Sequence, residues 1–235
     1  MKNHVIKIQT KDAFSLAKLY FLKTCGIGLE TDKHNRMWDR AKQVYEDVSK
    51  NLQLQAVLSV FTPCLIGKEM NINGRIFSCN GFEQLRHNCL LRVYAYILTA
   101  GECKVDSDLI VDQLYGDIWG TSFLDAGRVL LREQIESIEK RISGESVLSE
   151  SFGPGYYGME VTKVKDLFHV VDPGLIHVTL HKSGLMLPLK SCGGFFLSVK
   201  EECNLPLRNC ESCIGNPAGC HFCRRHTCVH RDQSV

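Results

Sequence analysis

The chain has 235 residues, of which 44% are hydrophobic and 23% are charged, and its formal net charge is only +2. This balance excludes an intrinsically disordered protein and a strongly basic nucleic-acid-binding surface. A chain of this length can bury one substantial core, so we expect one larger domain with an appendage rather than two full domains.

The N-terminal segment MKNHVIKIQTKDAFSL has no apolar run long enough for a signal peptide. No stretch approaches the ~18 apolar residues of a membrane-spanning helix, so we expect a cytoplasmic protein without membrane contact. In that compartment the twelve cysteines favour metal binding or redox chemistry over a disulfide framework. We expect Cys25, Cys64, Cys79 and Cys89 to pack in the core as small hydrophobes.

Two helices are expected at the start of the chain. Asp12 can cap the first, which ends at the Cys25-Gly26 step. The second covers about residues 36–49, where apolar side chains recur at three- and four-residue spacing. We assign residues 1–50 to an N-terminal helical segment.

A sheet is predicted next. Residues 52–77 contain short apolar runs, and Asn73-Gly74 is the preferred two-residue turn of a β-hairpin. The run CLLRVYAYILTAG, residues 89–101, is apolar on both faces, as expected of a central strand that feeds a loop.

A long helix is expected over about residues 106–142, with Trp119-Gly120 as the place where it could break. Glu133, Glu136 and Lys140 lie on its solvent side. Its buried stripe is formed by Leu131, Ile135, Ile138 and Ile142.

The segment SFGPGYYG then forces a rigid turn through its three glycines and Pro154. A short helix is predicted over residues 164–171, ending before Asp172-Pro173. Beyond it, LIHVTLH alternates as a strand, and GGFFLSV supplies another.

The C-terminal residues 201–235 form a small metal-binding tail. Gly215, Pro217 and Gly219 allow its two C-x2-C pairs to fold onto one another. Four thiolates complete a tetrahedral zinc site or hold a four-iron cluster. The six-residue gap between the pairs is shorter than the ~15 to 20 residues usual in zinc ribbons, which favours an iron-sulfur cluster over zinc. The predicted metal ligands are Cys210, Cys213, Cys220 and Cys223.

Residues 152–199 contain several motifs in a characteristic order. A Pro154-Gly155-Tyr156 turn precedes a short helix, a V-T-L strand at residues 178–180 and a Met-x-Pro-x-Lys-Ser turn that starts at Met186. In order and spacing these features resemble the activation domain of cobalamin-dependent methionine synthase, especially its short stand-alone relatives. Weaker similarity extends back toward Asn51.

The resemblance implies an α+β domain over residues 51–200, with a curved antiparallel sheet flanked by helices. It implies binding of S-adenosylmethionine, with Tyr156, Gly155, Pro154 and Glu133 as contacts by matching position. It also implies docking against a corrinoid protein, so that inactive cob(II)alamin can be reduced and remethylated.

Two positions depart from the family pattern. The family has an arginine just ahead of the Pro-Gly-Tyr turn, which should hold the methionine carboxylate through its guanidinium. This chain has Ser151 there, and serine supplies no charge. After the V-T-L strand, the family's Thr-Glu is His181-Lys182 here, which reverses a charge.

Two hypotheses about function follow. The first is an accessory protein for a corrinoid-dependent methyltransferase, whose tail assists reductive reactivation, since thiolate-bound clusters reach the low potential that Co(II) requires. The second is a non-enzymatic docking module with a structural zinc site and a degenerate S-adenosylmethionine cleft. The chain has no phosphate-binding loop, nucleophile elbow or HExxH, so whether it is an enzyme stays open. Its near-neutral charge disfavours nucleic-acid binding.

Overall fold

The computed structural model describes residues 3–28, 31–79, 82, 85, 89–144, 146–156 and 158–200. The predicted metal ligands Cys210, Cys213, Cys220 and Cys223 lie outside these described residues. In the parts of the chain that are described, no helix is long and apolar enough to cross a membrane.

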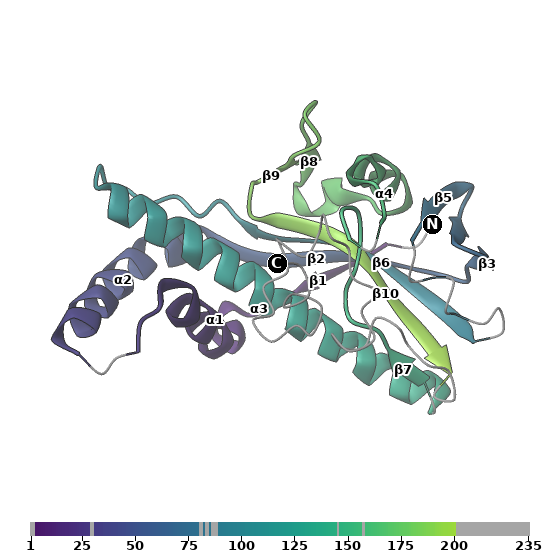
Figure 1. Cartoon of the computed structure of the whole chain (residues 1–235), viewed down its shortest axis with the longest axis horizontal. Helices are drawn as coiled ribbons and strands as arrows, with labels where there is room; N and C mark the ends of the chain where they lie inside the picture. The colour runs from purple at the N-terminus through teal and green to yellow at the C-terminus, as the bar shows by residue number, and fades with distance from the viewer. Residues whose placement is uncertain are drawn as a thin grey trace, which may run out of the picture.

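A five-stranded antiparallel sheet forms the centre of the structure, and its strand order is β1-β2-β6-β10-β7 (Figure 1). The fold is therefore α+β with an antiparallel sheet, as predicted. The N-terminal edge strand β1 was not expected from the sequence. The strands are β1 Asn3–Lys7, β2 Leu52–Phe61, β6 Leu90–Gly101, β7 Ser146–Leu148 and β10 Ser191–Lys200.

Strand β6 lies in the middle of the sheet and is buried on both faces, which confirms the central strand predicted from its apolar run. Side chains of successive residues point to opposite faces. Val93 and Ile97 belong to the hydrophobic cluster on one face, whereas Tyr94 and Tyr96 belong to the cluster on the other.

Three helices cover one face of the sheet (Figure 1). They are α1 Thr10–Cys25, α2 Asp32–Asn51 and α3 Ile110–Ser143. Trp119 of α3 is fully buried between them. Its ring stacks on Phe21 of α1 with 4.2 Å between ring centroids, and its indole N–H donates a 2.9 Å hydrogen bond to the Ala41 carbonyl of α2. The aromatic cluster thus joins all three helices.

Helix α3 continues without a break through Trp119-Gly120. Gly120 instead allows the preceding loop to approach the helix closely, because a Cβ there would lie 2.8 Å from the Cys103 sulfur. The predicted buried stripe is correct at Leu131 but wrong at its end, since Ile142 is 58% exposed. Glu139 is the buried residue of the last turns, at 1% exposure.

The opposite face is covered by shorter elements (Figure 1). These are a three-stranded sheet of β3 Cys64–Ile66, β4 Glu69–Ile72 and β5 Arg75–Ser78, the 3-10 turns Val161–Lys163 and Pro173–Ile176, helix α4 Val164–Val170, and a two-stranded hairpin of β8 Thr179–Leu180 and β9 Met186–Leu187.

Two predictions on this face, a hairpin turn and a strand, have different outcomes. Asn73-Gly74 joins β4 to β5 with φ values of 50° and 79°, the positive angles that such a hairpin turn requires. The strand predicted over LIHVTLH is wrong except at β8. Asp172 accepts a hydrogen bond from the Gly174 N–H and starts a 3-10 turn, and His177 has a φ of 56°, which interrupts any extended strand.

Candidate functional site

The Pro154-Gly155-Tyr156 turn lies at the edge of β10. After β7 the chain continues along this edge, where Phe152 and Phe195 exchange backbone hydrogen bonds of 3.2 and 2.7 Å. Gly155 has a φ of 91°, and its N–H donates to the Met159 carbonyl over 2.9 Å. The turn leaves the Tyr156 side chain 46% exposed at the sheet edge.

Glycines allow the turn segment to approach β10 this closely. A Cβ on Gly194 would lie 2.2 Å from the Phe152 carbonyl oxygen, and one on Gly153 would lie 2.8 Å from the Gly193 carbonyl oxygen. Both obstacles are backbone atoms, which a rotamer change cannot move. The pairing that positions Tyr156 therefore depends on residues without side chains.

We predict that Gly194→Ala destabilises the protein by about 1–3 kcal/mol, because the added methyl group must push the backbone at Phe152 away. Urea denaturation monitored by circular dichroism measures this. Gln53→Ala, at an exposed position of β2 in the same sheet but away from the turn, serves as the control. Equal stability of Gly194→Ala and the wild type would show that the segment is not tightly held.

Three polar side chains meet on the helix-covered face beside the turn. The Ser151 and Tyr96 hydroxyls share a hydrogen bond of 2.5 Å. Cys192 of β10 lies next to Tyr96, and burial raises the pKa of its thiol to about 11 although nearby Arg128 opposes the rise. Burial likewise raises the pKa of Tyr96. At neutral pH the group therefore consists of neutral donors and acceptors.

Arg128 of α3 brings a positive charge to this group. Its guanidinium lies 3.6 Å from the Asp125 carboxylate, and its side chain is 38% exposed. Burial acts to lower the pKa of Arg128, but the neighbouring Tyr96, Cys192 and Asp125 outweigh it, and the pKa is raised. Tyr156, in the turn, contributes in the same direction to the pKa of Arg128.

The donors of Arg128 are largely unused. A guanidinium carries five N–H donors, and this one forms no hydrogen bond with any residue in the described ranges beyond its ion pair. A half-buried cation with spare donors is well suited to a carboxylate or phosphate, which it can bind in a bidentate manner. We call the group of Arg128, Tyr96, Ser151, Tyr156 and Cys192 the Arg128 cluster, and it is a candidate anion site.

Arg128 was not predicted from the sequence as a site residue, although its position carried a signal. Arg128 precedes Leu131 by three residues and Ile135 by seven, so it lies on the same helix face as the buried stripe. A charged residue on a buried face is either paired or functional.

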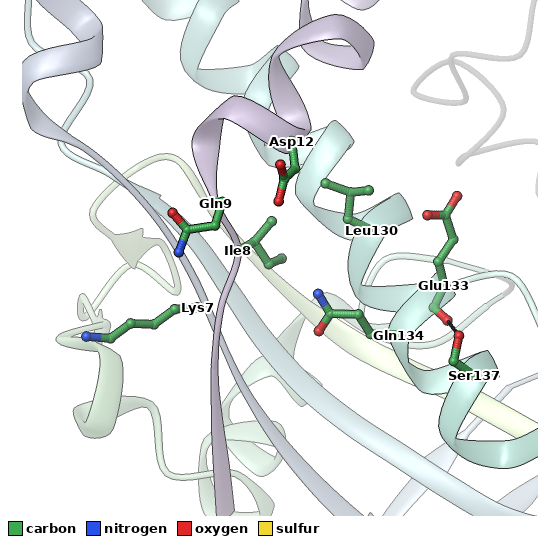
Figure 2. A pocket seen from close by; sticks show the side chains of 8 residues that line it. All are labelled: Lys7, Ile8, Gln9, Asp12, Leu130, Glu133, Gln134 and Ser137. Atoms are coloured by element: carbon green, nitrogen blue, oxygen red, sulfur yellow. Dashed lines mark hydrogen bonds between the residues drawn. The ribbon is translucent and has the colours of Figure 1, made fainter. Parts of the chain in front are cut away.

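Glu133 lies in a different part of the molecule from Tyr156. It lines a hollow of about 480 Å³ between α3 and the β1–α1 junction, and its backbone carbonyl accepts a hydrogen bond from the Ser137 hydroxyl (Figure 2). None of the turn residues lines this hollow. Its other lining residues are Lys7, Ile8, Gln9, Asp12, Leu130, Gln134 and Ser137.

The cysteines of the described domain follow their expected placement in part. Cys79 and Cys89 are buried, as predicted. Cys25 is half-buried against the helix-side core, and Cys64 is exposed, so the core prediction is wrong for Cys64. Cys89 is disulfide-bonded, although the sequence favoured other cysteine chemistry.

The described residues of the domain hold no metal-binding geometry. In residues 3–200, as far as they are described, no group of three or more His, Cys, Asp or Glu side chains is placed to hold a metal ion. The four-cysteine site in the tail stays a prediction from the sequence.

Comparison with known proteins shows a likeness at the level of the fold. No protein-family model and no curated protein matches the chain. The crystal structure of the MetH reactivation domain bound to AdoHcy matches with a TM-score of 0.64, over 87% of this chain and 80% of that chain. The chain has the fold of the MetH reactivation domain. Sequence identity is 13%, so the likeness establishes the fold alone.

Proposed function

We propose that this protein is an accessory factor for a corrinoid-dependent methyltransferase and assists reductive reactivation of its cobalamin cofactor. The observation that supports this most directly is the fold, which is shared with a reactivation domain over 87% of the chain. The motifs of residues 152–199 occur in the order that the activation-domain family has. The first of them forms the turn that contributes Tyr156 to the Arg128 cluster.

The proposed ligand of the Arg128 cluster is S-adenosylmethionine. Ser151 occupies the place of the family's carboxylate-binding arginine and cannot supply its charge. Arg128 approaches the same turn from α3, with donors that no described residue uses, and could hold the methionine carboxylate instead. Tyr156, Gly155 and Pro154 would then line the ligand, while Glu133 lies in the separate hollow beside β1.

The proposed role of the tail is to supply an electron. Cys210, Cys213, Cys220 and Cys223 would hold an iron-sulfur cluster, whose potential can lie low enough to reduce Co(II). One electron would pass from the reduced cluster to cob(II)alamin, giving cob(I)alamin and the oxidised cluster. An added reductant such as dithionite would return the cluster to its reduced state.

The test combines anaerobic purification with a reduction assay. We expect a brown protein with iron and sulfide in a ratio that fits a cluster, and faster loss of cob(II)alamin absorbance on a corrinoid protein in the presence of dithionite. A variant with all four tail cysteines changed to serine should lose both the colour and the acceleration, whereas Cys64→Ser, an exposed cysteine of the domain, should keep both.

The competing outcome is equally specific. Colourless protein with one equivalent of zinc, binding to a corrinoid protein without reducing it, would reject electron transfer. That result would support the docking module with a structural zinc site.

A further inference from the structure

A second hollow lies on the opposite side of the sheet from the Arg128 cluster. It is bounded by one face of α4 and by β8 with the residue pair that follows, and its volume is about 490 Å³. Small-molecule sites usually measure about 300–1,000 Å³, so a compact ligand would fit. We call it the α4–β8 pocket; its lining residues are Lys165, Phe168, His169, Leu180, His181 and Lys182.

The α4–β8 pocket combines an apolar floor with a basic rim. Phe168 and Leu180 are half-buried. Lys165 and His169 are exposed and share a helix face with Phe168, because the three residues are spaced by three and four positions. The rim is completed by His181 and Lys182, which directly follow β8 and are the pair that departs from the family pattern.

The imidazole of His181 is held in one orientation. Its Nδ1 accepts a 3.2 Å hydrogen bond from the Ser183 N–H, and it also lies 2.8 Å from the Ser183 hydroxyl. The turn is closed by the His181 N–H, which donates to the Leu185 carbonyl over 2.8 Å. With Nδ1 accepting from the backbone, the tautomer places hydrogen on Nε2, leaving an N–H donor on the exposed ring.

The positive charge of the rim is not neutralised locally. Neither Lys165 nor Lys182 forms an ion pair or hydrogen bond with any residue that the structure describes. Asp166, the neighbour of Lys165 in the chain, is already engaged by Lys163 at 3.0 Å and by Arg75 at 3.3 Å. Like charges gathered in a hollow without an acidic partner create a potential that attracts anions.

We propose that the α4–β8 pocket binds a nucleotide-like ligand, a phosphate-bearing molecule with a flat ring. Lys165, Lys182 and the His181 N–H would contact phosphate oxygens, whose charge they complement. Phe168 would stack with the ring, as aromatic side chains do with bases. The proposal does not depend on the function of the Arg128 cluster, which lies on the helix-covered face of the sheet.

Binding to the full-length protein should be measured by calorimetry with ADP, pyrophosphate and adenosine at constant ionic strength. We expect saturable ADP binding, weaker pyrophosphate binding and the weakest binding by adenosine. The double variant Lys165→Gln/Lys182→Gln should weaken ADP about 100-fold, since each charged hydrogen bond contributes about tenfold. Phe168→Leu should weaken ADP about tenfold but leave pyrophosphate unchanged.

The matched control is Lys42→Gln/Lys140→Gln, which removes the same charge from exposed positions on α2 and α3. We expect this control to bind ADP within about twofold of the wild type. An equal loss in the control would mean that general charge, not the pocket, attracts the ligand, and the proposal would be wrong. It would also be wrong if ADP fails to bind while an acidic peptide does, which would identify a protein-docking surface.

Discussion

Replacing Glu139 by alanine should lower the free energy of unfolding by about 3–5 kcal/mol, the usual cost of removing one partner from a buried charged pair. The Glu139 side chain is 2% exposed. Its carboxylate accepts hydrogen bonds from Ser198 at 2.6 Å, from Ser146 at 3.0 Å and from Tyr94, and it pairs with Arg92 at 3.2 Å. Alanine would leave the buried hydroxyls of Tyr94 and Ser198 without this acceptor. Urea denaturation would measure the loss.

Glu136→Ala is the matched control, because Glu136 is on the same helix with its side chain 33% exposed and forms only surface ion pairs. We expect it to cost less than about 1 kcal/mol. If Glu139→Ala is no more destabilising than this control, the buried network contributes little.

The same carboxylate predicts how stability depends on pH. Burial acts to raise the pKa of Glu139, but hydrogen bonds from Ser198, Tyr94 and Ser146 and the charge of Arg92 outweigh it and lower the pKa. A pKa that is lower in the folded state stabilises the protein at neutral pH, and this contribution is lost as the pH falls below about 4.3. Glu139→Gln should therefore lose less stability than the wild type on acidification.

Glu139 also shows where sequence patterns reach their limit. The spacing of apolar residues predicted the position of α3 and the burial of Leu131 correctly. It placed Ile142 inside and overlooked Glu139, because a glutamate on a helix normally faces solvent. Its burial is explained by hydrogen-bond partners on other elements, of which Tyr94 on β6 and Ser198 on β10 lie 45 and 59 residues away in the sequence.

The strands, too, divide into those that local sequence predicts and those that depend on distant residues. The central strand and the Asn73-Gly74 hairpin were predictable, because both depend on local composition and turn chemistry. The edge strand β1 was not, since its stability comes from pairing with β2, which is about 50 residues away in the register. In the candidate site, the Pro-Gly-Tyr turn was recognisable from its motif. Helix spacing alone puts Arg128 on the buried face of α3, but its place beside Tyr96 and Cys192 depends on how the chain folds.

Arg128→Gln should weaken binding of S-adenosylmethionine and S-adenosylhomocysteine by about 30-fold or more, as expected when one partner of a desolvated charge pair is removed. Calorimetry on the full-length protein measures this. The affinity of Arg128→Lys should fall between those of the wild type and Arg128→Gln, because lysine keeps the charge but not the bidentate geometry. Arg141→Gln removes an exposed arginine from the same helix and should bind like the wild type.

A second-site change separates a ligand contact from a merely structural role. In the Arg128→Gln background, Ser151→Arg should recover part of the affinity, because it returns a guanidinium to the position beside the Pro-Gly-Tyr turn where the family has one. A structural defect caused by losing the Asp125 ion pair would not be repaired from Ser151, which bonds to Tyr96 instead. Unchanged affinity in Arg128→Gln would show that Arg128 does not bind the methionine carboxylate. If the wild type does not bind S-adenosylmethionine at all, this ligand is wrong for the Arg128 cluster.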